Sequence, residues 1–134
     1  EESFYLSNIC PQNRNLNKGD WNDLEEEARE WARRYGAVCI VCGPEGADEP
    51  AGWIGDAPVA VPARFFKVFL RMEAGGAKAI GFLFANRAGS RPLAEYAVSV
   101  DRVEQETGLD FFASLPDEAE QAAESACRPG EWGL

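Results

Sequence analysis

Apolar residues recur at steps of three and four between Asp20 and Gly36, which is the spacing of an α-helix that buries one face. The residues on this face are Trp21, Leu24, Ala28, Trp31, Ala32 and Tyr35. Asp20 is the candidate N-cap, and Gly36 lies where such a helix would end. The pattern predicts a helix over residues 20–35 whose two tryptophans belong to the core and not to a base-stacking surface.

Shorter apolar runs bounded by glycine or proline predict strands. Residues 37–43 form such a run and are expected to be a buried strand. Residues 65–71 and 77–84 flank a glycine-rich turn, which is typical of an antiparallel hairpin. Further strands are expected at 3–9, 59–61 and 96–99, helices at 100–107 and 117–126, a loop at 44–56 and an unstructured tail from Arg128.

Strands and helices interleave along the chain without a repeat, a linker or a regular βαβ order. A chain of 134 residues is long enough for one core of useful size. We therefore expect a single domain over residues 1–134, with a tail at 128–134. The expected class is α+β, with helices packed on an antiparallel or mixed sheet.

The composition narrows the chemistry. The chain has no histidine, so it supplies no imidazole as general base or metal ligand. Its formal net charge is −10, and residues 101–134 hold nine of the acidic groups and two of the basic ones. This acidity disfavours nucleic-acid binding by the surface as a whole. Basic residues that could still line one site are Arg14, Lys18, Arg29, Arg33, Arg34, Arg64 and Lys67.

The chain opens at Glu1, and Met72 is its only methionine, so we expect it to be a piece of a longer product. No run of about 18 apolar residues is present, and no membrane span is expected. An upstream leader that has been removed stays an open alternative.

Three polar residues, Asn17, Glu25 and Arg29, follow one another at steps of eight and four. If the turn is already helical at Asn17, that residue lies about 80° from Glu25, and Glu25 lies about 40° from Arg29. One edge of the helix would then present an amide oxygen, a carboxylate and a guanidinium. The spacing equally describes an exposed i,i+4 ion pair between Glu25 and Arg29, which stabilises a helix only slightly.

The surrounding sequence carries a longer series of motifs. In chain order they are Phe4-Tyr5-Leu6-Ser7-Asn8-Ile9-Cys10-Pro11-Gln12, Leu16-Asn17-Lys18-Gly19-Asp20-Trp21, Leu24-Glu25, Val61-Pro62-Ala63-Arg64-Phe65-Phe66-Lys67-Val68, Tyr96-Ala97-Val98-Ser99-Val100, and Thr107-Gly108-Leu109-Asp110-Phe111-Phe112 before Leu115-Pro116. This co-linear series resembles the DNA/RNA non-specific endonucleases, the endonuclease G-like family of ββα-metal (His-Me finger) nucleases. The resemblance covers roughly residues 3–125.

The resemblance implies a ββα-metal fold and hydrolysis of DNA and RNA phosphodiester bonds without sequence preference. It implies that Asn17 is the protein ligand of one Mg²⁺, or of another divalent cation such as Mn²⁺. It also implies that Glu25 supports the hydrated metal and that Arg29 stabilises the phosphate in the transition state. These residue types suit the chemistry, because Mg²⁺ keeps most of its waters and accepts few protein oxygens.

Other residues take peripheral roles under the same resemblance. Asn8 is expected to border the site, and Arg14 and Lys18 are expected to contact the substrate. Contacts confined to phosphate and sugar would explain indifference to base sequence. The implied partners are DNA and RNA, together with the upstream segment of the same protein.

One element of the family's pattern is missing from this sequence. The family's general base is a histidine in an Asp-Arg-Gly-His motif upstream of the strand that holds Asn8, and this chain begins after that point. Asp101-Arg102 continues with Val103-Glu104, so it is not a displaced copy. We therefore expect an N-terminally truncated chain without a general base, slowed by about 10²–10⁴. The alternatives are a nicked nuclease that retains the missing segment, and an inactive remnant that binds nucleic acid or protein.

The cysteines offer a rival hypothesis. Cys39 and Cys42 form a Cys-x-x-Cys motif, and with Cys10 and Cys127 they could build a structural zinc site. In a strand, however, positions 39 and 42 point to opposite faces, which favours buried thiols. A disulfide between Cys127 and Cys10, or another cysteine, stays open.

The sequence says less about the protein's surroundings. A homodimer is an open expectation, and no residue pattern decides the oligomeric state. On family grounds, we expect an exported bacterial protein, secreted or periplasmic.

Overall fold

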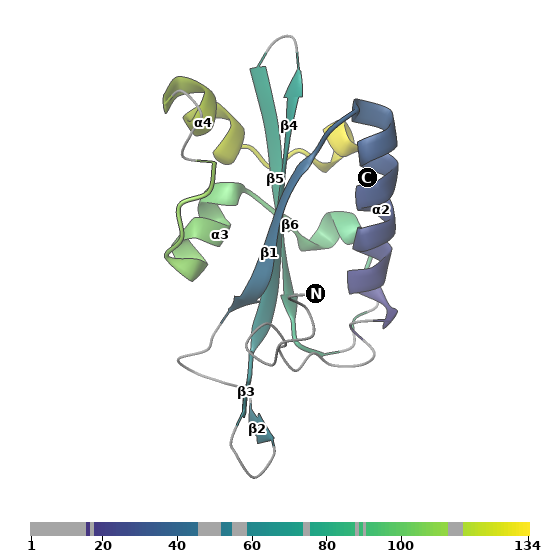
Figure 1. The fold of residues 1–134 in the computed structure, drawn as a ribbon, viewed down its shortest axis with the longest axis vertical. Coiled ribbons are helices and arrows are strands. Elements are labelled where there is room, and N and C mark those ends of the chain that lie inside the picture. The colour runs from purple at the N-terminus through teal and green to yellow at the C-terminus, as the bar shows by residue number, and fades with distance from the viewer. Residues whose placement is uncertain are drawn as a thin grey trace, which may run out of the picture.

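The computed structural model describes residues 16, 18–45, 52–54, 59–73, 76–87, 89, 91–112 and 117–134. Its centre is a four-stranded antiparallel sheet in the order β1-β4-β5-β6. The strands are β1 (Cys39–Glu45), β4 (Arg64–Glu73), β5 (Gly76–Ala85) and β6 (Ala97–Val98). Helix α2 (Asp20–Tyr35) lies on one side of this sheet, and α3 (Val100–Thr107) and α4 (Asp117–Glu124) lie on the other (Figure 1). The expected α+β class is confirmed.

The hairpin of β4 and β5 forms the middle of the sheet. Its register runs from Arg64 opposite Ala85 to Glu73 opposite Gly76. The sequence predicts both strands, and the structure extends each by a few residues. Helices cover both faces, so β4 is buried continuously from Phe65 to Arg71 and does not alternate between core and solvent.

Each face of the sheet has its own apolar core. Beneath α2, the buried residues include Trp21, Leu24, Trp31, Phe65, Phe69, Phe82 and Phe84. Beneath α3 and α4, they include Phe66, Val68, Leu70, Val100, Val103 and Phe111. The predicted core positions of Trp21 and Trp31 are confirmed, with 8% and 0% of their surface exposed.

Gly81 of β5 explains how closely α3 approaches the sheet. A β-carbon built at Gly81 would lie 2.8 Å from Cγ2 of Val103. Any larger side chain there would push α3 away, so glycine is required by packing. The same helix is capped at its start by Ser99, whose side chain accepts from the Arg102 amide, and it ends at Gly108 with φ +74°.

The C-terminal segment is not the unstructured tail that the sequence predicts. Residues Pro129–Trp132 form the 3-10 helix η4, and Trp132 is 1% exposed. The indole Nε1 of Trp31 donates to the Trp132 carbonyl at 2.7 Å, and the two rings lie 5.0 Å apart. Burial of Trp132 therefore anchors the short polar segment Pro129–Trp132 to the core beneath α2.

Three smaller expectations also need correction. β1 is an exposed edge strand and not a buried one, with Ile40 and Val41 exposed. The expected loop at 44–56 contains β2 (Gly52–Ile54), which pairs with the predicted strand β3 (Val59–Val61). Asp20 does not cap α2, because the cap position is Gly19 and no side chain caps the helix there.

The remaining elements follow the sequence closely. Helices α3 and α4 lie within the predicted ranges, and Gly36 ends α2 by donating its amide to the Ala32 carbonyl. The expected strand at 96–99 becomes the 3-10 helix η3 (Leu93–Tyr96) followed by β6. The expected strand at 3–9 lies outside the described residues. No helix in the described part of the chain has the length and apolarity needed to cross a membrane.

Trp132 provides a test of the C-terminal packing. Trp132→Ala is expected to lower the free energy of unfolding by about 3–5 kcal/mol, because it empties a fully buried site. Urea denaturation measures this change. The control is Leu109→Ala, half exposed at 50%, which is expected to stay within about 0.5 kcal/mol of the parent. Equal effects of the two substitutions would contradict the packing.

Candidate functional site

Helix α2 carries the two described residues to which the sequence assigns catalytic roles. Glu25 is half-buried and Arg29 is exposed, one turn further along the same flank of the helix. Among the described residues, the two side chains form no ion pair or hydrogen bond with each other. The simple i,i+4 ion pair that the spacing also allows is therefore not formed, and both charged groups remain available at the surface.

Lys67 reaches this flank of α2 from the sheet. It lies in β4 on the face that α2 covers, is 6% exposed, and its Nζ is 4.5 Å from the centre of the Trp21 ring. Burial lowers the pKa of the Lys67 ammonium. Charge interactions with Cys42 and then with Glu25 raise that pKa, and the positive charge of Arg29 lowers it.

Lys67 therefore interacts electrostatically with residues of two other elements. Cys42 lies directly opposite it in the β1–β4 register, while Glu25 and Arg29 belong to α2. We call Glu25, Arg29 and Lys67 the α2 flank site. It combines one carboxylate that can accept from metal-bound water with two cations that can attract a phosphate. Composition named Lys67 among seven basic candidates, but no sequence pattern linked it to Glu25.

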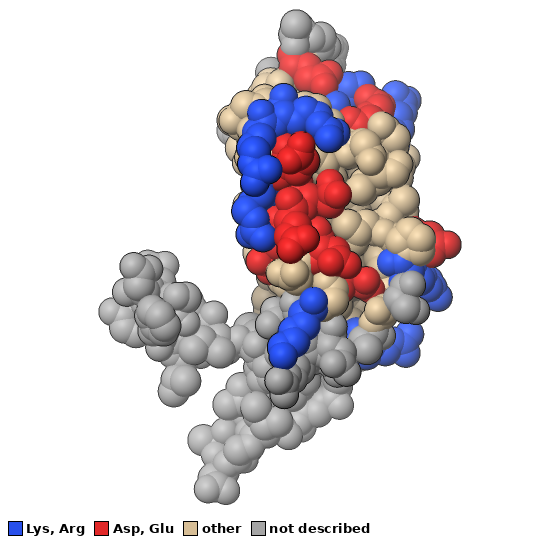
Figure 2. Space-filling view, turned by 90° about the vertical axis from the view of Figure 1, so that its right-hand side faces the viewer, with Lys and Arg blue, Asp and Glu red and all other residues tan. Residues whose placement is uncertain are grey.

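The outward face of α2 is strongly charged. Figure 2 shows acidic side chains through the middle of this face and basic side chains along one of its edges. Glu30 pairs with Arg33 at 3.1 Å and with Arg34 at 3.8 Å, and all three side chains are largely solvent-exposed. The acidic middle repels a polyanion, so a phosphate backbone is favoured only along the basic edge.

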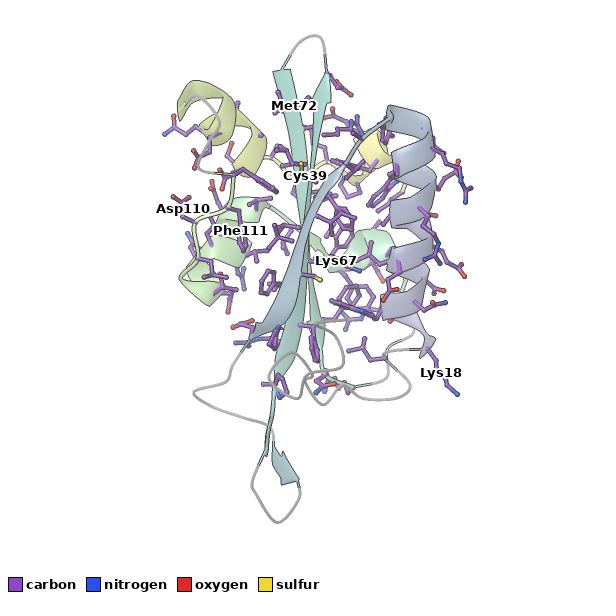
Figure 3. The ribbon with its side chains drawn as sticks, viewed as in Figure 1. Lys18, Cys39, Lys67, Met72, Asp110 and Phe111 are labelled. Carbon is purple, nitrogen blue, oxygen red and sulfur yellow. The ribbon has the colours of Figure 1, made fainter. Side chains whose placement is uncertain are left out.

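The other sequence-predicted residues lie near the start of α2 or upstream of it. Lys18 is exposed at that end and extends away from the helix into solvent (Figure 3). Asn17, Asn8 and Arg14 lie outside the described residues. The structure therefore brings Glu25 and Arg29 onto one flank with Lys67, and it leaves the other assignments as predictions.

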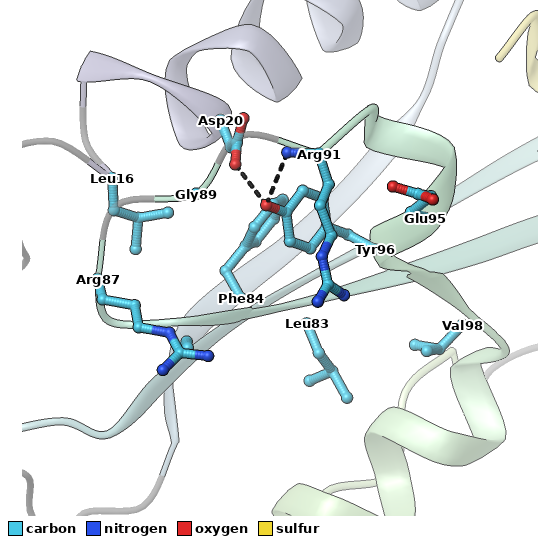
Figure 4. Close-up of a pocket in the computed structure, with 11 residues that line it drawn as sticks. Leu16, Asp20, Leu83, Phe84, Arg87, Gly89, Arg91, Glu95, Tyr96 and Val98 are labelled. Atoms are coloured by element: carbon cyan, nitrogen blue, oxygen red, sulfur yellow. Dashed lines mark hydrogen bonds between the residues drawn. The ribbon is translucent and has the colours of Figure 1, made fainter.

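A pocket of about 490 Å³ lies beside the start of α2, between that helix, β5 and η3. Asp20 and Tyr96 form its polar wall: the Tyr96 hydroxyl donates to Asp20 Oδ2 at 2.6 Å and accepts from the Arg91 amide at 3.4 Å (Figure 4). The side chains of Arg87 and Arg91 also line it. Sequence reasoning missed this pocket, because its residues come from distant segments: Asp20 and Tyr96 alone lie 76 positions apart.

The pocket and the α2 flank site lie on opposite sides of the helix's buried stripe. At 100° per residue, Asp20 is about 140° from Glu25 around the helix. Asp20 faces η3 and the β5–β6 edge through Tyr96, whereas Glu25 acts on Lys67, whose strand neighbours are β1 and β5. A ligand bound at the α2 flank site would therefore not fill the pocket.

The described residues also contain an acidic cluster, which we define as Glu104, Asp110, Glu120 and Glu124. One carboxylate oxygen from each residue lies within 4.8 Å of the others, a spacing at which they could hold a metal ion. The cluster belongs to α3, the segment after it, and α4, so it lies across the sheet from Glu25 and Arg29 (Figure 1). It is not the metal site that the sequence motifs imply.

The described cysteines form neither a zinc site nor a buried set. Cys39, Cys42 and Cys127 are free and exposed, so the expectation of buried thiols is wrong for them. Cys39 pairs with Leu70 and Cys42 with Lys67, which places the two thiols on opposite faces of β1. Cys10 lies outside the described residues.

Comparison with protein families gives one match: residues 1–118 match the model described as DNA/RNA non-specific endonuclease. Three curated relatives illustrate the similarity. Mitochondrial nuclease 1 of Schizosaccharomyces pombe is 35% identical over an alignment 132 residues long that covers 86% of this chain. Mitochondrial nuclease EXOG of Homo sapiens is 37% identical over 85% of this chain, and human mitochondrial endonuclease G is 33% identical over 86%.

The similarity extends to a solved structure. A chain in the crystal structure of an EndoG/EndoGI complex, described as showing the mechanism of EndoG inhibition, matches 88% of this chain with a TM-score of 0.76 and 29% identity. This chain spans 41% of the yeast relative, 35% and 43% of the two human relatives, and 54% of the solved chain. It therefore corresponds to about two fifths of the length of these curated relatives.

The relatives overturn one expectation about location. The nucleases of fission yeast and of animals that match this chain are named as mitochondrial. The expectation of a secreted or periplasmic bacterial protein is wrong, because it rested on the family alone and the named members of that family point elsewhere.

The Tyr96–Asp20 hydrogen bond can be tested by a double-mutant cycle. Asp20 is 7% exposed, and within the described residues Tyr96 is its side-chain partner. Tyr96→Phe and Asp20→Asn are expected to show a coupling of about 1 kcal/mol or more in the free energy of unfolding. Additive effects of the two substitutions would contradict the contact.

The same pair predicts a dependence on pH. Burial, and then the hydrogen bond to Asp20, raise the pKa of the Tyr96 hydroxyl above its ordinary value of 10.0. The folded state then holds this proton more tightly than the unfolded state, so the contribution is complete below pH 10.0 and is lost as the pH rises further. The difference in stability between the parent and Tyr96→Phe should shrink over that alkaline range.

Proposed function

The chain belongs to the DNA/RNA non-specific endonuclease family, and we propose that it forms the metal-ligand half and the C-terminal body, one domain over 1–134, of a Mg²⁺-dependent nuclease. Its substrates would be DNA and RNA, cut without strong sequence preference. The observation that carries this proposal is the match of residues 1–118 to the family, with Glu25 and Arg29 side by side on α2.

Glu25 fits a role beside a hydrated metal ion. Its carboxylate is half-buried, and none of the hydrogen bonds or ion pairs among the described residues uses it. An oxygen acceptor held on a helix and left unpaired suits the waters that Mg²⁺ retains. In this proposal Asn17 supplies the direct protein ligand, and Glu25 orients the metal-bound waters. The bound ion, Mg²⁺ or Mn²⁺, would supply Lewis-acid charge at a phosphate oxygen.

Arg29 supplies the protein's own positive charge to the reacting phosphate. It is exposed, it lies one turn from Glu25, and its guanidinium can donate two parallel hydrogen bonds to phosphate oxygens. Such a donor lowers the barrier when negative charge builds on those oxygens. The ammonium of Lys67, behind both residues, adds attraction for the anion from a buried position.

The remaining assignments extend the site towards the substrate. In this proposal Asn8 would border the site, and Arg14 and Lys18 would contact the substrate. Contacts of this kind bind phosphate and sugar, and they carry no base specificity. The proposal has two further partners: a second copy of this chain and the upstream segment of the same protein.

The general base must come from outside this chain. The 134 residues contain no histidine, and the α2 flank site offers a carboxylate, a guanidinium and an ammonium but no imidazole. We therefore propose that the chain alone is a poor catalyst and that a segment carrying Asp-Arg-Gly-His completes the site.

The first experiment compares two forms of the protein. Digestion of plasmid DNA and of RNA, with Mg²⁺ and with excess chelator, is measured for this chain and for the product of the full gene. The longer form is expected to cut at least about 10² times faster, because a positioned base is worth about 10²–10⁴. Intact mass spectrometry of each sample identifies any second peptide.

Each outcome decides between the alternatives. Cutting by the chain alone, with no second peptide in the sample, would contradict the missing-base mechanism. If neither form cuts, the chain is instead an inactive remnant that binds nucleic acid or protein, and retention of either form on immobilised DNA would then support that second function.

Point variants of the longer form test the α2 flank site. Arg29→Ala is expected to reduce kcat by about 10²–10³, because it removes a donor to the charged transition state. Glu25→Gln is expected to cost about 10–100-fold through weaker metal support. Asn17→Ala should be severely impaired in activity and retain its fold.

One control is matched to Glu25 by its helix and charge, and the other is matched to Arg29 by its charge. Glu26→Gln changes an exposed residue of α2, and Arg102→Ala changes an exposed arginine of α3 across the sheet. Activity of both should stay within about twofold of the parent. Thermal unfolding of all variants should be similar. Near-normal activity of Arg29→Ala, or equal loss in Arg102→Ala, would rule out the assigned roles.

A further inference from the structure

Four carboxylates gather on the side of the sheet away from α2. Glu104 belongs to α3, Asp110 follows that helix, and Glu120 and Glu124 lie one turn apart on α4. Figure 3 shows Asp110 on this side of the molecule, beyond Phe111, which points into the core. In the described part of the chain, no Lys or Arg forms an ion pair with any of the four.

Glu124 distinguishes this acidic cluster from an ordinary acidic surface. The residue is 1% exposed, and neither carboxylate oxygen has a hydrogen-bond donor among the described residues. Its polar neighbours are instead the carboxyl groups of Glu104 and Glu120. A buried charge without a partner is costly, so the native protein needs a positive charge or a proton at this position.

The electrostatic environment agrees with that requirement. Burial, and then the neighbouring carboxyl groups of Glu104 and Glu120, raise the pKa of Glu124 to about 9. A bound divalent cation would supply the positive charge that this buried carboxylate lacks among the described residues.

The geometry selects the kind of cation. The donor atoms are oxygens only, which favours a hard ion such as Ca²⁺ or Mg²⁺ over zinc or copper. Ca²⁺ binds oxygen at about 2.4 Å, so ligands on opposite sides of one ion are separated by about 4.8 Å. The four oxygens lie within 4.8 Å of one another, so all of them can reach one ion of this size. Mg²⁺ demands a tighter octahedron and retains more water.

We propose that the acidic cluster binds one calcium ion, which holds α4 against α3. Glu124 closes the inner side of the site, and exposed Asp110 forms its outer side. Glu104 is already oriented, because its Oε2 accepts from the Phe111 amide at 2.8 Å. The ion would neutralise part of the acidic C-terminal region and stabilise the fold, with no direct part in phosphodiester cleavage.

The site is independent of the proposed nuclease chemistry. It uses none of the residues of the α2 flank site, and the sheet with its two apolar cores separates the two. Its failure and the failure of the nuclease proposal are therefore distinguishable experimentally, because the calcium site is measured by binding and stability and the nuclease site by cleavage.

The test titrates the full 134-residue chain with Ca²⁺ after removal of metals with a chelator. Calorimetry is expected to show one Ca²⁺ bound per chain, and about 1 mM Ca²⁺ should raise Tm by several degrees. Asp110→Asn and Glu120→Gln should weaken Ca²⁺ binding at least about tenfold. Glu124→Gln should weaken binding similarly. If this buried variant does not fold, the variant of exposed Asp110 still tests the site.

Stability without metal gives a second readout. Removing one of four clustered carboxylates relieves repulsion, so Asp110→Asn should melt at or above the parent's Tm in chelator and below it in Ca²⁺. A residue with only a structural role would shift Tm in the same direction under both conditions.

Two matched controls locate the ion. Asp101→Asn, also on α3 but outside the acidic cluster, and Glu25→Gln, across the sheet, should both bind Ca²⁺ like the parent. The proposal is overturned if the parent shows no binding at millimolar Ca²⁺, if the cluster variants bind as the parent does, or if Mg²⁺ binds this cluster more tightly than Ca²⁺.

Discussion

Lys67 and Arg71 are two buried cations of strand β4, and aromatic rings, together with the Glu73 carboxylate for Arg71, compensate their burial. Lys67 Nζ lies 4.5 Å from the centre of the Trp21 ring, and the Arg71 guanidinium lies 3.8 Å from that of Tyr35 and 4.5 Å from that of Trp132. Burial of a charge without such partners is costly. Because Trp21 and Tyr35 stand at opposite ends of α2, the two cations hold the whole helix along β4. Arg71 also holds the C-terminal segment against the sheet, since its guanidinium donates to the Glu131 carbonyl at 2.8 Å.

The position of α2 then decides where chemistry is possible. Its buried stripe turns Glu25 and Arg29 towards Lys67 on one flank and Asp20 towards Tyr96 on the other. Glu25 and Arg29 thus lie within electrostatic range of a buried lysine, and a separate pocket forms beside the start of the helix. Across the sheet the acidic cluster holds four of the C-terminal carboxylates away from the α2 flank, so this part of the chain's acidity does not oppose phosphate binding there.

The sequence predicted helix α2, the β4–β5 hairpin and α3. Each depends on apolar spacing or on turn and cap residues within a short stretch of chain. The 3.6-residue period marked α2 from end to end, and Gly108 marked the end of α3. The prediction failed where a partner distant in sequence decides the outcome. An apolar run such as that of β1 has the same sequence pattern in a central strand and in an edge strand. No local pattern around Trp132 predicts its contact with Trp31. Of the candidate site, Glu25 and Arg29 were accessible through motifs, and Lys67 was only one basic residue among several.

The sequence by itself determined the family, through co-linear motifs, and the absence of any imidazole, through composition. It also determined most helices and strands, because backbone preference and amphipathic period are local properties of the chain. Only the tertiary structure decided which polar side chains of different elements influence one another: Lys67 and Glu25 electrostatically, Asp20 and Tyr96 by a hydrogen bond, and Glu124 and Glu104 as neighbouring carboxyl groups. The physical reason is that such encounters depend on how helices pack on the two faces of a sheet, and packing joins residues that no short stretch of sequence relates.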